Sequence, residues 1–202
     1  MHAINVLRNE HRSIAAVLNG LSEVVRGIGE RGEAPNFDLL GAIVYYMDAF
    51  PERCHHPKEN RYLFRLLRMR APASAPLVDR LEHEHRIGAL KIRALEQALE
   101  RYRSGGAAEF PAFAAVADDF VAFNRAHMHA EDAEAIPLAR EHLTAEDWVA
   151  IDVAFAGHSD PLVGIDAVAP YNQLFSRIVN LAPPPLGVGP SAEEHAQGRV
   201  RA

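Results

Sequence analysis

Apolar side chains recur every three or four residues along most of the chain, which is the spacing of one buried face of a helix. The pattern predicts four long helices, over about residues 3–28, 37–69, 76–103 and 108–141. No stretch alternates apolar and polar residues cleanly enough to indicate a strand of a sheet. The fold class expected from the pattern alone is therefore all-α.

Glycine and proline mark where these helices should end or bend. Gly27, Gly29 and Gly32 should end the first helix. Pro51 and Pro57 lie inside the second helix, and each removes a backbone donor. We therefore expect the second helix to kink or break briefly near those prolines.

The chain after the fourth helix changes character. Thr144, followed by acidic residues, predicts the start of a shorter fifth helix through Trp148, Ile151 and Phe155. A loop over residues 157–164 and a sixth helix from Tyr171 to Leu181 should follow.

This organisation predicts a four-helix bundle at residues 1–142, with a helical extension packed on it at residues 143–182. Residues 183–202 are rich in proline and glycine and are expected to form a flexible tail.

Composition and charge exclude several classes of protein. The chain has 202 residues, is 49% hydrophobic and carries a formal net charge of −6, with its basic residues scattered, so nucleic acid is not expected as a partner. Cys54 is the only cysteine, which excludes a disulfide framework and a cysteine-type zinc site. Residues 1–20 match neither a signal peptide nor a membrane span, so we expect a soluble cytoplasmic protein without a membrane partner. The unusual count is that of histidine, with 11 in all.

Two segments repeat the same pair of polar residues on a face that otherwise looks buried. His55 and Glu59 are four residues apart, as are His127 and Glu131, so each pair lies about 40° apart on one face of its helix. Apolar residues follow both pairs. Burying imidazoles and carboxylates is costly unless something binds them, and a metal ion is the simplest candidate.

Helical register selects among the remaining histidines. His83 and His85 are about 200° apart, and the apolar register favours His85 as the inward one. The same argument favours His127 over His129. His55 and His56 are only about 100° apart and Pro57 follows, so the register leaves that choice open, with His56 held in reserve.

A single inward histidine is more often a hydrogen-bonded core residue than a metal ligand. Four helices that each offer one, together with two inward glutamates, favour a shared metal site. A mixed set of imidazoles and carboxylates without cysteine suits iron, manganese or zinc. The candidate ligands are His11, His55, His56, Glu59, His85, His127 and Glu131.

Two other kinds of site fit less well. Glu52-x-x-His55 and Glu82-x-x-His85 match the motif of ferritin-like di-iron proteins, but the histidine-rich arrangement on the other helices does not. A hydrolase is not favoured, because no Gly-x-Ser-x-Gly segment occurs and Cys54 beside His55 is weak evidence for a catalytic dyad.

Four segments together resemble the hemerythrin-like family, whose members share the HHE cation-binding domain. They are Glu10-His11, the run at 55–64 (HHPKENRYLF), the run at 82–85 (EHEH) and the run at 127–138 (HMHAEDAEAIPL). The resemblance covers residues from about 4 to 140 in the order of the family. The stretch from Leu143 to Phe155 and the later Asp160-Pro161-Leu162 also resemble bacterial members with extra C-terminal helices.

The resemblance implies an antiparallel up-down four-helix bundle with one or two extra C-terminal helices. It also implies a non-haem di-iron centre, bridged by Glu59 and Glu131 and by an oxo or hydroxo group. The expected function is to bind, sense or handle O2, NO or peroxide. A di-iron redox enzyme of peroxidase or oxidase type, or a bundle that binds zinc or another metal without redox chemistry, are the alternatives.

The chain departs from the oxygen-carrying hemerythrins on the third helix. Those proteins have His-x-x-x-His there, whereas this chain has Leu81 and Ala89 at four residues on either side of His85. With four histidines, two bridging carboxylates and a bridging oxygen, two octahedral ions would keep about two open positions unless His56 fills one.

Overall fold

The computed structural model describes residues 2–156, and within them the chain is helical with no strand. The predicted sixth helix at 171–181, the loop before it and the tail at 183–202 lie outside the described residues. In chain order the elements are α1 (His2–Arg31), α2 (Phe37–Met47), η1 (Asp48–His55), α3 (His56–Lys58), η2 (Glu59–Phe64), α4 (Arg65–Arg70), η3 (Pro72–Ser74), α5 (Ala75–Gly105), η4 (Gly106–Glu109), α6 (Phe110–Ala130), η5 (Glu131–Ala135), α7 (Ile136–His142) and α8 (Ala145–Ala156).

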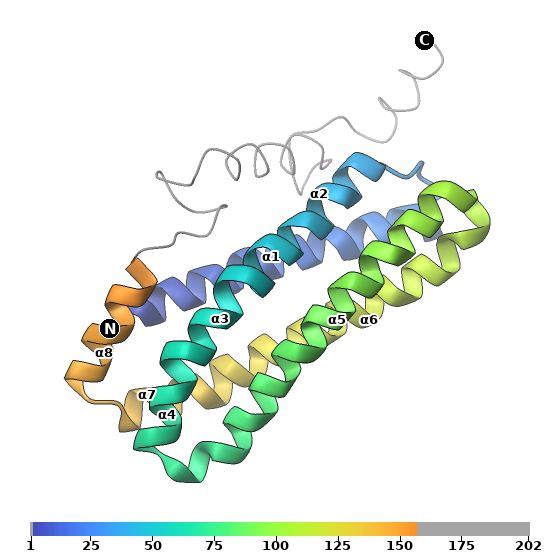
Figure 1. The fold of residues 1–202 in the computed structure, drawn as a ribbon. Coiled ribbons are helices and arrows are strands. Elements are labelled where there is room, and N and C mark those ends of the chain that lie inside the picture. The colour runs from blue at the N-terminus through green and yellow to red at the C-terminus, as the bar shows by residue number, and fades with distance from the viewer. Residues whose placement is uncertain (1, 157–202) are drawn as a thin grey trace.

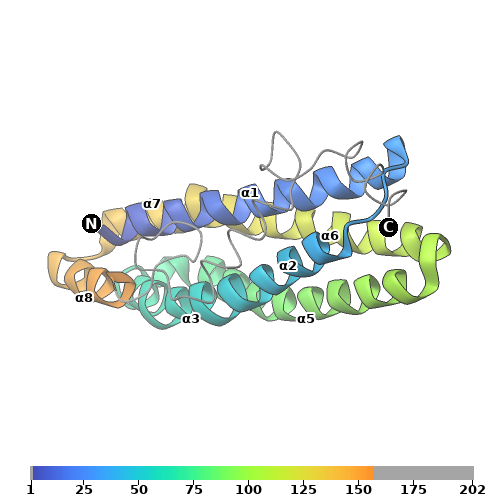
Figure 2. The same ribbon diagram turned by 90° about the horizontal axis from the view of Figure 1, so that it is seen from above.

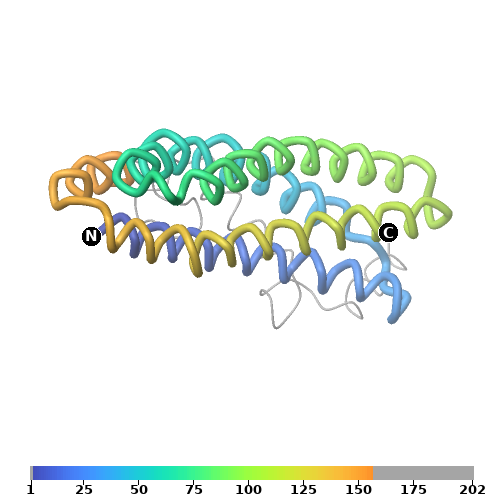
Figure 3. The backbone as a smooth tube through the Cα atoms, turned by 90° about the horizontal axis from the view of Figure 1, so that it is seen from below, coloured from blue at the N-terminus to red at the C-terminus, as the bar shows by residue number. Residues whose placement is uncertain are grey.

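Four long helical stretches lie side by side in an elongated bundle (Figures 1 and 2). They are α1, the run from α2 to α4, α5, and the run from α6 to α7. Helix α1 packs against α2 and α6, and α5 packs against the same two, so each stretch has two neighbours. The close pairing of α1 with α6 is visible from below (Figure 3). None of the helices described at 2–156 is both long and apolar enough to cross a bilayer.

The first helix runs past two of the glycines that were expected to end it. It continues through Gly27 and Gly29 to Arg31, and Gly32 then takes a φ of 67° that other residues rarely adopt. A β-carbon at Gly29 would lie 3.3 Å from the ring of Phe110, so this glycine lets α1 approach the start of α6. A glycine inside a helix costs only about 1 kcal/mol, which the packing of a long helix can offset.

The second stretch is continuous from Phe37 to Arg70, so the prolines do not break it. It widens instead into two turns with π-helical hydrogen bonding, η1 and η2, and Pro51 lies inside η1. A third such turn, η5, begins at Glu131. Turns of this type are rare and often mark functional sites. Here they carry His55, Glu59 and Glu131.

The interior consists of two apolar clusters with a polar layer between them. The first cluster fills the half of the bundle around Leu18, Leu21, Leu40, Phe113 and Phe120. The second fills the half around Leu7, Phe64, Leu81, Ile136 and Phe155. The polar residues between them are also buried: Glu10, His11, His55, His56, Glu59, His85, Asn124, His127 and Glu131.

Helix α8 closes the end of the bundle at which α4 ends (Figure 1). It begins with reciprocal capping, in which Thr144 Oγ1 accepts from the Asp147 amide at 3.3 Å and Asp147 Oδ2 accepts from the Thr144 amide at 3.0 Å. Arg70 donates to both oxygens of Asp147, at 2.7 and 3.1 Å. Trp148, Ile151 and Phe155 are buried against the bundle.

We expect Asp147→Asn to lower the melting temperature by about 2–5 °C at neutral pH, because it weakens both the cap and the contact with Arg70. Hydrogen bonds from Arg70 hold the pKa of Asp147 near 2, below its usual value of 3.8. A carboxylate with a depressed pKa stabilises the fold above its unfolded pKa and loses that effect as the pH falls through its folded pKa. The difference between the two proteins should therefore shrink between about pH 4 and pH 2.

The measurement is a series of thermal melts at falling pH, with Asp118→Asn as the control. Asp118 is an exposed carboxylate on α6, and its loss should leave the melting temperature unchanged. A pH-independent deficit in Asp147→Asn would mean that the charge of Asp147 is not what fixes α8.

Candidate metal centre

The structure brings all seven sequence-predicted ligands into the polar layer and buries each of them. They fall into two groups, His56, His85 and His127 in one, and His11, His55, Glu59 and Glu131 in the other. Within each group, one nitrogen or oxygen atom of every residue lies within 4.8 Å of those of the others. His83 and His129 are exposed, as their helical register predicts.

The open choice between His55 and His56 has a structural answer, since both are buried, with 1% and 7% of their surfaces exposed. The widened turn η1 ends at His55, and His56 begins α3. A π-helical turn spreads more residues around the axis than an α-helical one, so the register of a regular helix did not apply here. The two neighbouring imidazoles join different groups, His55 beside His11 and His56 beside His85.

The two carboxylates of the second group also reach the histidines of the first. Glu59 Oε1 is 3.4 Å from His55 Nε2, whereas its Oε2 is 3.5 Å from His85 Nε2. Glu131 Oε2 is 3.3 Å from His11 Nε2, whereas its Oε1 is 3.3 Å from His127 Nε2. Each glutamate thus presents one oxygen to each group, which is the arrangement needed to bridge two cations.

Two properties of the donor atoms suit metal ions: the distances between them and the absence of hydrogen-bond partners for several of them. His85 Nε2 and His127 Nε2 are 2.9 Å apart, and two ligand atoms about 2.1 Å from one ion at a right angle would be about 3 Å apart. Several buried donor atoms have no hydrogen-bond partner, namely His11 Nε2, Glu59 Oε2 and both carboxylate oxygens of Glu131. Buried polar atoms normally have partners, and a cation would serve all of these at once.

Each of the five imidazoles presents its other ring nitrogen, Nδ1, to an oxygen. Three of these contacts are hydrogen bonds of 2.8 Å, with Glu10 Oε2 for His55, Asn60 Oδ1 for His85 and Glu84 Oε2 for His127. The other two are longer contacts without a hydrogen bond, with Asp132 Oδ2 for His11 at 3.3 Å and Glu52 Oε2 for His56 at 3.5 Å. An Nδ1–H that donates to oxygen leaves Nε2 as the lone-pair nitrogen, which is how metal-ligating histidines are usually oriented.

Sequence reasoning did not assign a role to these five oxygen-bearing residues. Glu52 and His56 are four residues apart, so their contact follows from helical spacing. Glu10 and Glu84 sit next to His11 and His85 in the sequence but contact histidines of other helices, His55 and His127. No spacing rule within one helix reveals such contacts.

Burial and mutual charge shift the protonation of the groups. Burial, and then the charge of Glu131, raises the pKa of Glu59 to about 8. Burial alone would lower the pKa of His127, but Glu131 and Glu84 raise it to about 9. Burial lowers the pKa of His85 to about 4. At neutral pH, and without a cation, protons on Glu59 and His127 therefore offset part of the buried negative charge.

The amino group of Lys58 lies at the edge of the site. Its side chain is 8% exposed, its Nζ lies 5.3 Å from the centre of the Phe155 ring, and burial lowers its pKa. Phe155 belongs to α8, so the helix that closes the end of the bundle also covers this side of the polar layer.

We expect Gly88→Ala to weaken metal binding by about tenfold or more without unfolding the protein. A β-carbon at Gly88 would lie 2.8 Å from Glu52 Oε1, so the Glu52 side chain would have to move away from His56. Its carboxylate lies at the free end of a side chain, which limits the cost to the fold. Chelator competition measures the affinity.

Gly20→Ala is the matched control, since nothing lies within 4 Å of a β-carbon added there. That variant should keep the wild-type affinity for metal and melt at the same or a slightly higher temperature. Equal metal affinity in both variants would contradict a role for Glu52 in orienting His56.

His85→Ala should lose metal, because His85 Nε2 contacts His127 and the carboxylates of Glu59 and Glu131. His83→Ala, which removes an exposed imidazole two residues away, should bind metal as the wild type does. Metal analysis of both variants after identical loading compares them. Loss of metal from His83→Ala alone would place the ligands on the opposite face of α5.

Comparison with known proteins agrees with this geometry. The family model described as the hemerythrin HHE cation-binding domain matches residues 2–139, which include all seven residues of the two groups. No curated protein and no solved structure matches the chain. The family match covers well over half of the sequence, and the chain therefore belongs to the hemerythrin HHE cation-binding domain family.

Proposed function

We propose that this protein holds a non-haem di-iron centre and uses it to bind, sense or handle a small ligand of the class of O2, NO or peroxide. The observation that carries the proposal is the position of Glu59 and Glu131. Each presents one oxygen to the His11 and His55 side and the other to the His85 and His127 side. One ion would leave half of these oxygens unused.

The donor set favours iron over zinc. Imidazole nitrogens and carboxylate oxygens without thiolate suit iron. On the side of His56, His85 and His127, three imidazoles and two carboxylate oxygens would give five protein donors, one more than a tetrahedral zinc site uses. The proposed bundle is antiparallel and up-down, with a C-terminal extension at 143–182 of which α8 (Ala145–Ala156) is the described helix. The turns that join its long helices are short, as such a topology requires.

Counting donors assigns unequal roles to the two ions. His56, His85 and His127, two carboxylate oxygens and a bridging oxo or hydroxo group would complete about six positions at one ion. His11 and His55, with the same three bridges, leave about one position open at the other. His56 thus supplies the fifth imidazole that Leu81 cannot, and reduces the two open positions expected from four histidines to one.

The residues of the chain fix the rings and exclude water. Bound iron would supply the redox change and the open position for the exogenous ligand. The Nδ1 hydrogen bonds keep Nε2 of His55, His85 and His127 directed inward, and the two apolar clusters cover the layer along the bundle in both directions.

Protein loaded with iron should contain about two ions per chain and bind about one azide per centre, with visible charge-transfer bands. His56→Ala should open a second position and increase the azide bound. One tightly held ion per chain would contradict the dinuclear proposal. Two ions without azide bands would favour zinc or another metal without redox chemistry.

His129→Ala is the control for this titration, because His129 is exposed on the other side of α6. It should match the wild type in both metal content and azide binding. Turnover with peroxide or O2 as substrate would identify a redox enzyme on the same centre, whereas saturable binding without turnover would identify a carrier or sensor.

A further inference from the structure

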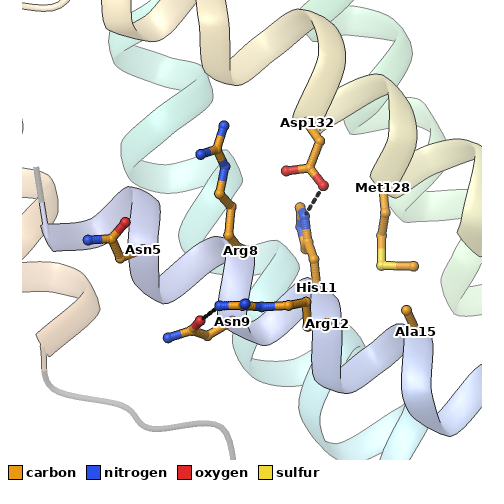
Figure 4. Close-up of a pocket in the computed structure, with 8 residues that line it drawn as sticks. All are labelled: Asn5, Arg8, Asn9, His11, Arg12, Ala15, Met128 and Asp132. Carbon is orange, nitrogen blue, oxygen red and sulfur yellow. Dashed lines mark hydrogen bonds and ion pairs between the residues drawn. The ribbon is translucent and has the colours of Figure 1, made fainter.

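A cavity of about 710 Å³ opens beside His11, between α1 and the junction of α6 with η5 (Figure 4). Asn5, Arg8, Asn9 and Arg12 line it from α1. Positions 5, 8, 9 and 12 follow the repeat of three and four residues that marks one helix face, so they form one polar stripe along α1. Nothing in the proposed metal chemistry requires two arginines and two asparagines at this place.

The two guanidinium groups leave positive charge available to a ligand. No acidic side chain in the described part of the chain forms an ion pair with Arg8, and Arg12 donates to the neutral amide oxygen of Asn9. In Figure 4, the Arg8 side chain extends from α1 toward the level of Asp132, whereas Arg12 turns back toward Asn9. Guanidinium groups bind carboxylates through paired, charge-assisted hydrogen bonds.

The rest of the lining limits what the ligand can be. Met128 and Ala15 form an apolar wall suited to a short carbon chain. The Asp132 side chain, 41% exposed, is the acidic group of the cavity, and its Oδ2 already contacts His11 Nδ1 at 3.3 Å. A ligand that carries a hydrogen-bond donor beside its carboxylate would meet an acceptor there.

We propose that this cavity binds a small hydroxy- or amino-carboxylate, with its carboxylate on Arg8 and its donor group directed to Asp132. Arg12 would leave Asn9 and turn to the same carboxylate when the ligand binds. The site is separate from the buried donor atoms of the metal centre, but it touches them through Asp132 and His11. Binding of the carboxylate itself does not depend on metal, because the two arginines project from α1 outside the polar layer.

The test uses the full chain, titrated with L-malate in a calorimeter, with metal content measured on the same samples. Wild-type protein should show saturable binding, and Arg8→Gln and Arg12→Gln should each weaken it by about tenfold or more. Succinate, which lacks the hydroxyl group, should bind more weakly than malate. Arg93→Gln removes an exposed guanidinium from α5 and should bind malate as the wild type does.

Absence of saturable malate binding at millimolar concentrations would overturn the proposal. So would an equal loss of affinity in Arg93→Gln, which would indicate a general effect of net charge. Equal affinities for succinate and malate would contradict the part assigned to Asp132. Because metal content is measured separately, a negative result in protein that holds two ions contradicts the cavity proposal alone.

Discussion

Two carboxylates buried in the middle of the bundle are the constraint that the rest of the structure has to meet. Glu59 and Glu131 are each about 1% exposed, and apolar clusters flank their layer on both sides. Such groups cannot remain charged in an apolar interior without partners. The chain surrounds them with five imidazoles, and further carboxylates and an amide lie behind those imidazoles. The carboxylates at the centre of the layer therefore need positive charge, whereas the groups at its edge accept hydrogen bonds from the imidazoles. If packing were the only requirement, leucine at these positions would avoid the cost of burying polar groups.

The backbone accommodates this layer through its widened turns. Glu59 and Glu131 each begin a turn of π-helical hydrogen bonding, and His55 ends another. Such turns let a helix direct adjacent side chains inward that a regular helix would spread around its circumference. Pro51 and Pro137 lie within or just after two of them, where a missing backbone donor costs least because the regular bonding pattern is already interrupted. The prolines are therefore consistent with a local change of helix type, where the expectation from sequence was a kink or a brief break.

The sequence was sufficient for features that follow a fixed helical period. It predicted the four long helices, the burial of His85 and His127, and the exposure of His83 and His129, because α5 and α6 are regular where these residues lie. It did not decide between His55 and His56, since the period changes at η1. It did not place the end of α1, where packing of Gly29 against Phe110 prolongs the helix. Contacts such as Glu10 with His55 depend on how separate helices face one another, which no pattern within one helix encodes.

Protons and metal ions compete for the same buried atoms. In the protein without a cation, His127 carries a proton at neutral pH, which its Nε2 can donate to His85 Nε2 at 2.9 Å. Glu59, with a pKa of about 8, is largely protonated under the same conditions. Burial alone would lower the pKa of His11, but Asp132, Glu131 and Glu59 hold it well above its usual value. Cations that took these places would displace the protons of His11, Glu59 and His127, so loading would release protons and the affinity for metal would fall as the pH drops. The polar layer therefore persists in either state because one set of positive charges replaces the other.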